Sequence, residues 1–148
     1  MTRDKFHKFC KSLPMTNYIV QWRGSHVWKI GGRVFAIYRC GILKNQGITF
    51  KVSEITYECM KTVKGIRPAP YFASRGMKWL QYYGTESELT DDELRFFLAE
   101  SYLIVANGLT KKKKVELGID TWIMYPYKCM TIQRVDCIVL NYCYSLIK

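Results

Sequence analysis

The sequence predicts a single α+β domain in which an antiparallel sheet of about four or five strands carries helices packed on one face. A chain of 148 residues with 49% hydrophobic residues can bury one substantial core. Helical periodicity occurs near both ends of residues 1–117, and short β-prone runs separated by turn residues lie between them. This order of elements is typical of an α+β fold.

The first expected element is a helix. Thr2 can cap it, and apolar residues recur at helical spacing until Pro14 stops the pattern. Three lysines then share its solvent-facing side. After the helix, residues 17–22 form a short β-prone run, so we expect the first strand there.

A β-hairpin is expected next. Two glycines at residues 31–32 separate the runs 26–30 and 33–38, and two-residue hairpin turns favour glycine because they need positive φ. If the turn is tight, Trp28 lies opposite Phe35, and this aromatic face belongs in the core.

The middle of the chain continues the sheet. Residues 41–47 form a loop long enough to project as a wing, and residues 48–52 alternate between apolar and polar side chains, as in a strand. Ser53 caps a following helix that Gly65 closes.

Two prolines then define a stiff corner. Pro68 and Pro70 fix their own φ and restrict the residues before them, so the chain there must be extended. We expect this corner to pack Tyr71 on the sheet and to lead into a strand at residues 77–83.

The last predicted elements are helical. Thr90 and Glu93 fit a capping box, and an apolar stripe continues to Gly108. A shorter helix begins at residues 111–114. The domain is expected to span residues 1–117, followed by a C-terminal extension of uncertain structure at residues 118–148.

Charge is unevenly distributed along the chain. The net charge is +11, and residues 1–53 hold ten Lys and Arg residues against one acidic residue, a net charge of +9. Such an excess attracts polyanions, including nucleic acid, although it can also serve solubility alone.

Common catalytic and metal-binding motifs are absent. The sequence contains no GxGxxG, P-loop, HExxH or GxSxG motif, and its six cysteines form no CxxC pair. We therefore expect no metal and no cofactor. With no signal-peptide or membrane-spanning pattern, the expected location is the cytoplasm, with reduced thiols.

Five segments together resemble one protein family. They are TRDKFHKFCKSLP, QWRGSHVWKIGGRVFA, TFKVSE, GIRPAPYFASRGMKWL and LTDDELRFFLAESYLIVANGLTKK, and they occur in this order within residues 2–117. In combination they are similar to the MmcQ/YjbR family of small bacterial proteins. The resemblance implies an α+β domain of the "double-wing" type, which is often described as DNA-binding.

The expected function is non-enzymatic binding of duplex DNA through its phosphates, with the turn at residues 31–32 and the loop at residues 41–47 as wings. The expected contacts come from Lys29, Arg33, Lys44, Lys51, Arg67, Arg75 and Lys78. One alternative is a protein-interaction module that uses the corner at residues 68–71 and exposed aromatic side chains. A second is an enzyme for a small anion, with His26 and Arg67 lining its pocket.

Overall fold

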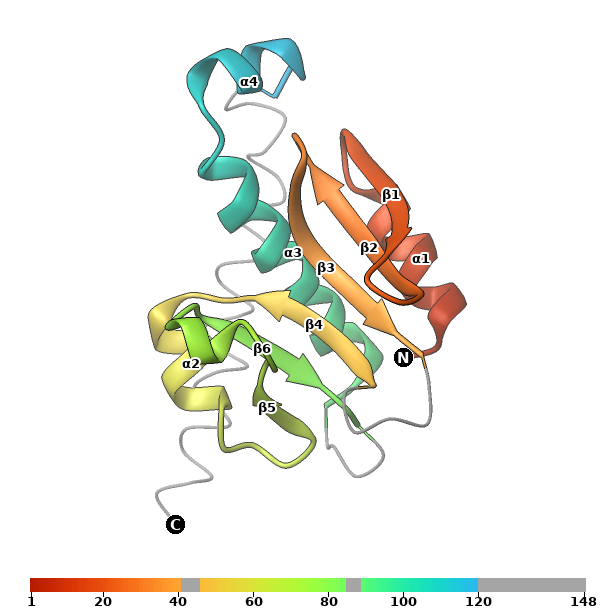
Figure 1. Cartoon of the computed structure of the whole chain (residues 1–148), viewed down its shortest axis with the longest axis vertical. Coiled ribbons are helices and arrows are strands. Elements are labelled where there is room, and N and C mark those ends of the chain that lie inside the picture. Colours follow the sequence, from red (N-terminus) through yellow and green to blue (C-terminus); the bar gives the residue numbers. More distant parts are fainter. Residues whose placement is uncertain (41–45, 85–88, 120–148) are drawn as a thin grey trace.

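A six-stranded antiparallel sheet in the order β1-β2-β3-β4-β6-β5 organises the part of the chain that the structure describes (Figure 1). The structure is a computed structural model, and it describes residues 1–40, 46–84 and 89–119. The strands are β1 (Thr16–Gln21), β2 (Ser25–Ile30), β3 (Arg33–Arg39), β4 (Gly47–Lys51), β5 (Ile66–Pro68) and β6 (Trp79–Tyr82).

The sheet has more strands than the sequence indicates because part of the proline corner is a strand. Ile66 lies opposite Tyr82, and Pro68 lies opposite Leu80, so β5 forms one edge of the sheet. Proline is tolerated there because an edge strand has no second neighbour that needs its N–H.

The helices begin where the sequence places them. They are α1 (Arg3–Ser12), α2 (Glu54–Met60), α3 (Asp91–Asn107) and α4 (Lys111–Glu116), with a short 3₁₀ turn, η1 (Ala73–Arg75). The side chains of Thr2, Ser53 and Thr90 accept hydrogen bonds from the first turns of α1, α2 and α3, and Thr90 with Glu93 completes the predicted capping box. No helix in the described ranges is long and apolar enough to cross a lipid bilayer.

The core lies between one face of the sheet and helices α1 and α3, which confirms that the helices pack on one face. Phe50 of β4 stacks on Phe97 of α3, with ring centroids 5.8 Å apart. Trp28 of β2 is buried and donates its indole N–H to His7 Nδ1 of α1. The core extends to Ile119, while residues 120–148 of the predicted extension lie outside the described residues.

The predicted pairing of Trp28 with Phe35 is wrong because β3 contains a bulge. Lys29 lies opposite Val34, but Trp28 lies opposite Ala36, so Phe35 is the extra residue. The glycine turn itself is confirmed, since both of its residues have positive φ. The bulge therefore shifts the register only beyond the first two pairs.

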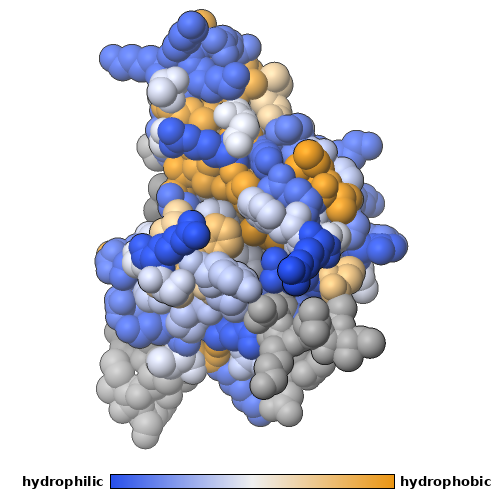
Figure 2. All heavy atoms as spheres, viewed as in Figure 1, coloured by the Kyte–Doolittle hydropathy of each residue, from blue (hydrophilic) through white to orange (hydrophobic). Residues whose placement is uncertain are grey.

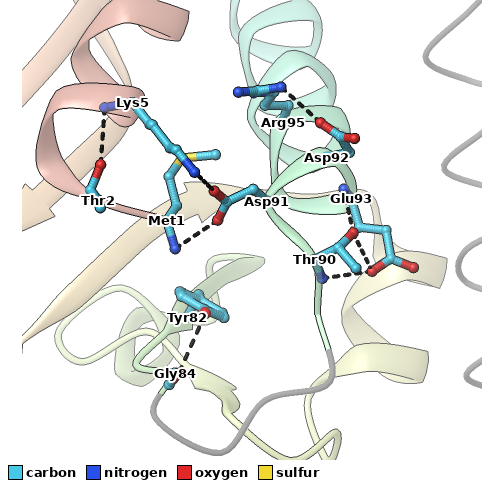
Figure 3. A network of polar contacts seen from close by, with 10 residues as sticks. All are labelled: Met1, Thr2, Lys5, Tyr82, Gly84, Thr90, Asp91, Asp92, Glu93 and Arg95. Carbon is cyan, nitrogen blue, oxygen red and sulfur yellow. Dashed lines mark hydrogen bonds and ion pairs between the residues drawn. The ribbon is translucent and has the colours of Figure 1, made fainter.

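The two long helices are joined at their N-terminal ends (Figure 3). Lys5 Nζ of α1 lies 2.7 Å from the Asp91 carboxylate of α3, and the amino group of Met1 lies 2.9 Å from the same carboxylate. This contact ties the first helix to the helix that covers the centre of the sheet.

Candidate functional site

The face of the sheet opposite α1 and α3, here called the open face, carries one continuous row of side chains across five strands. The pairing places Val27, Ile37, Thr49, Gln81 and Arg67 opposite one another on β2, β3, β4, β6 and β5. Residues two positions away on each strand share this face because strand side chains alternate. Figure 2 views the molecule from this side, and hydrophilic residues cover much of it.

Part of this row is a polar chain in which Thr49 and Gln81 are buried and Arg67 is partly buried. Arg67 Nε and Nη2 donate to Gln81 Oε1 at 2.9 and 2.7 Å, and Gln81 Nε2 donates to Thr49 Oγ1 at 3.2 Å. The guanidinium fixes which end of the Gln81 amide is the acceptor, and so the amide N–H must point toward Thr49. Thr49 therefore accepts this bond and keeps its own hydroxyl hydrogen for another acceptor.

A cavity of about 710 Å³ lies over the middle of this row. Its floor comes from β3, β4 and β6, one wall comes from the β1–β2 turn, and another comes from the segment between β5 and β6. Its described lining residues are Trp22, Arg23, Ile37, Arg39, Cys40, Gln46, Thr49, Pro70, Tyr71, Phe72, Arg75, Met77 and Gln81. The ring of Phe72 stacks on Trp79 with centroids 4.5 Å apart, which holds the second wall against the sheet.

The cavity walls contain strained backbone. Among the described residues, four non-glycine residues have positive φ, and three of them line the cavity: Trp22 (50°), Arg23 (59°) and Tyr71 (69°). Backbone of this kind is costly for residues with a Cβ and is concentrated at functional sites. The fourth, Met15, is not among the lining residues.

Two of the residues with positive φ are aromatic, and their side chains are exposed to solvent. Trp22 is 50% exposed and Tyr71 is 68% exposed. The expectation that Tyr71 packs on the sheet is therefore wrong, and the neighbouring Phe72 packs there instead. Positive φ at Tyr71 turns its side chain away from the sheet while the proline corner stays in contact with it.

Cations surround the cavity. Arg23, Arg39 and Arg75 line it, and its described lining residues include no carboxylate. Arg39 Nε donates to Ser25 Oγ at 3.0 Å, and Ser25 Oγ donates to the Trp22 carbonyl oxygen. The arginine thus supports the same turn that carries Trp22. Clustered arginines in a concave site favour an anionic ligand.

Four of the predicted contact residues lie on or beside this surface. Lys29 and Lys51 follow the open-face residues Val27 and Thr49 by two positions, so they share the open face, where Arg67 also lies. Lys29 Nζ donates to Gln21 Oε1 at 3.1 Å. Arg75 lines the cavity itself.

The other three predicted residues are placed differently. Arg33 Nη1 donates to the Gly108 carbonyl oxygen at the C-terminal end of α3. Lys78 Nζ lies 2.7 Å from Glu54 and 3.7 Å from Glu58, and its hydrogen bond with Glu54 raises the pKa of Lys78. Lys44 lies outside the described residues. Neither Arg33 nor Lys78 is grouped with the cavity arginines.

The two predicted wings also differ from expectation. A Cβ at Gly31 would come within 2.9 Å of the Leu109 side chain, so the glycine turn packs against the end of α3 and does not project freely. The second wing, the loop at residues 41–47, falls mainly on residues outside the described ranges.

His26 and Arg67 do not share a pocket. His26 lies in the cross-strand row of Tyr38, whereas Arg67 lies in the adjacent row, on the opposite face of the sheet. The Tyr18 hydroxyl lies 2.6 Å from His26 Nδ1, and His7 contacts the same ring. Burial has the largest effect on the pKa of His7 and lowers it, and the nearby His26 lowers it further.

Sequence reasoning missed Trp22, Arg23, Arg39, Thr49 and Gln81. The sequence predicts Trp22 only as the end of a strand, and it assigns no binding role to Arg23 or Arg39. One signal was available: Gln81 is an amide within an otherwise apolar and aromatic run, which marks a buried polar group that needs partners.

Comparison with known proteins identifies the family of the chain. No curated protein matches the chain. The model of the YjbR family matches residues 11–104, which is more than half of the chain and includes all six strands and most of α3. The chain therefore belongs to the YjbR family.

Proposed function

We propose that the protein binds DNA, with phosphate groups held by the cationic side chains of the open face. One observation carries this proposal: six cationic side chains of the described residues gather on or beside this face. They are Arg23, Lys29, Arg39, Lys51, Arg67 and Arg75. They project from strands and tight turns, so their backbone positions do not depend on a ligand.

Charge and geometry support phosphate as the ligand group. A guanidinium donates two parallel hydrogen bonds to a phosphate, and half of the cations in this set line one cavity. The opposite face cannot serve in the same way, since α1 and α3 cover it with the hydrophobic core. The proposal needs no catalytic residue, so we propose a non-enzymatic role.

The protein-interaction alternative rests on the same surface. Trp22 and Tyr71 are large, exposed aromatic residues, which are common at protein interfaces. Binding dominated by such residues would depend little on salt, whereas phosphate binding releases counterions and weakens steeply as salt rises. Salt dependence therefore separates the two functions.

The test is the affinity for generic duplex DNA measured across a range of salt concentrations. About five phosphate contacts give a log–log slope of roughly −5. The triple variant Lys29→Gln, Lys51→Gln, Arg75→Gln should flatten this slope by about 2–3 units, because each removed cation releases about one counterion fewer.

A matched control removes three charges elsewhere. Lys8 and Lys11 of α1 and Lys112 of α4 are exposed, and none of them forms an ion pair with another described residue. Their replacement by Gln changes the net charge equally. In this control variant, the slope of log affinity against log salt concentration should stay close to that of the wild type. Equal losses from both triple variants, or a flat salt dependence in the wild type, would contradict phosphate binding by the open face.

A further inference from the structure

We infer that the cavity on the open face binds one unpaired nucleotide, with its base against the aromatic walls and its phosphate on the arginines. The inference rests on the proposed function and deepens it, since it makes single-stranded or locally unpaired nucleic acid the preferred ligand. Three features of the cavity carry it: its size and shape, its exposed aromatic rings and its polar floor.

The cavity has the dimensions of a small-molecule site. Its volume of about 710 Å³ falls in the range of roughly 300–1,000 Å³ that is usual for such ligands. A base inside a duplex has both of its faces covered by its neighbours and must leave the stack to enter a pocket. A concave site of this size therefore suits an unpaired nucleotide better than an intact base pair.

The aromatic walls suit a base. Trp22 and Tyr71 come from opposite ends of the sheet order, one beside β1 and the other after β5, and both line the cavity. Each is half exposed or more. Bases stack on such rings with little regard to sequence, and each stacked base contributes ~10-fold or more to affinity.

The strained backbone is explained by this role. Trp22 and Tyr71 both have positive φ, which an ordinary turn would assign to glycine or asparagine. Arg39 and Ser25 hold the first of these residues in place through the Trp22 carbonyl oxygen. The chain thus keeps a large aromatic residue at a position where its conformation is unfavourable.

The floor and rim supply the polar contacts of a nucleotide. The Thr49 hydroxyl accepts from Gln81, and its hydrogen has no acceptor among the described residues, so it can donate to a base carbonyl or a phosphate oxygen. Arg39 uses Nε for Ser25, and its remaining N–H groups have no hydrogen-bond partner within the described ranges. Arg23 and Arg75 are exposed at the rim.

The experiment compares three labelled DNA ligands: a 12-nucleotide thymidine strand, the same strand with abasic sites throughout, and a 12-base-pair duplex. The first two carry equal numbers of phosphates, so their affinity ratio isolates the bases. We expect the wild type to bind the thymidine strand about 10-fold or more tightly than the abasic strand. Equal affinity for these two strands would overturn the inference.

Matched variants locate the effect. Trp22→Asn and Tyr71→Asn remove one ring each and place at positive φ a residue that tolerates it. Met15→Asn places the same residue at positive φ, at an exposed position outside the cavity, and removes no ring. Each cavity variant should bring the ratio of the affinity for the thymidine strand to that for the abasic strand toward one. Its affinity for the abasic strand should stay unchanged. The Met15 variant should keep the wild-type ratio, and an equal fall in all three would overturn the inference.

A further arm separates a nucleic-acid strand from a free nucleotide. Thymidine monophosphate should bind the wild type more tightly than deoxyribose 5-phosphate, and Tyr71→Asn should abolish the difference. No difference between these two compounds, together with no preference for the thymidine strand, excludes a nucleotide pocket. If salt-dependent binding of the duplex and the abasic strand persists in that case, the proposed function stands while this inference fails.

Discussion

At the scale of single residues, one hydroxyl on α3 closes the gap that the bulge opens in the sheet. Ser101 Oγ donates to the carbonyl oxygen of the bulged Phe35 and accepts from the backbone N–H of Lys51 at 2.8 Å. Ser101 is completely buried. Both backbone groups therefore depend on this side chain, because water cannot replace it.

Ser101→Ala should lower the free energy of unfolding by about 2 kcal/mol, since it leaves a buried donor and a buried acceptor unpaired. Urea unfolding measures this loss. Ser12→Ala is the matched control because the Ser12 hydroxyl also donates to a carbonyl oxygen, but at an exposed site, where the expected loss is about 0.5 kcal/mol. Similar losses from both variants would show that the bulge does not need the hydroxyl.

At the scale of elements, Asp91 joins the first turn of α3 to α1 (Figure 3). Its hydrogen bond with Lys5, and then that with the amino group of Met1, lower the pKa of Asp91 from 3.8 to about 2. A carboxyl whose folded pKa is lowered stabilises the fold above its unfolded pKa. That stability is lost as the pH falls from about 4 toward 2.

Asp91→Asn should therefore lower the free energy of unfolding at pH 7 and have little effect near pH 2. Solvent screening limits the loss to about 1 kcal/mol, because the carboxylate is partly exposed. Chemical unfolding at both pH values tests this. Asp4→Asn removes a nearly fully exposed carboxylate of α1 and should change stability less at pH 7. An equal effect of Asp91→Asn at both pH values would contradict the ion-pair explanation.

Which elements could be predicted from the sequence depends on how local their signals are. Thr2, Ser53 and Thr90 cap helices through contacts three residues away, so the helix starts follow from the sequence alone. The edge strand β5 and the bulge at Phe35 depend on partners distant in the chain, and a proline-rich segment gives no strand signal.

The residues of the candidate site also differ in how far the sequence alone predicts them. Alternation along predicted strands places Lys29 and Lys51 on one face once the strands are known. The cavity could not be predicted, because the β1–β2 turn that carries Trp22 and the β5–β6 segment that carries Tyr71 meet only through the sheet between them. Positive φ at two aromatic residues also has no sequence signal.

At the scale of the whole molecule, the two faces of the sheet separate stability from binding. The face under α1 and α3 holds most of the core, while the open face carries the cavity and its arginines. Arg23 and Arg75 are exposed, and no hydrogen bond or ion pair joins either side chain to another described residue. Their removal should therefore cost little stability, whereas a bound anion should add to it.

The double variant Arg23→Gln, Arg75→Gln should unfold within about 0.5 kcal/mol of the wild type in the absence of phosphate. Inorganic phosphate at about ten times its Kd stabilises a binding protein by about 1.4 kcal/mol, which raises the Tm of a chain of this size by about 3–6 °C. Phosphate also stabilises proteins generally by its exclusion from their surfaces, and that part is common to both proteins. Thermal unfolding with phosphate, and with sodium chloride at equal ionic strength, isolates the specific part as the excess rise in the wild type. The same rise in both proteins would mean that these two arginines hold no phosphate.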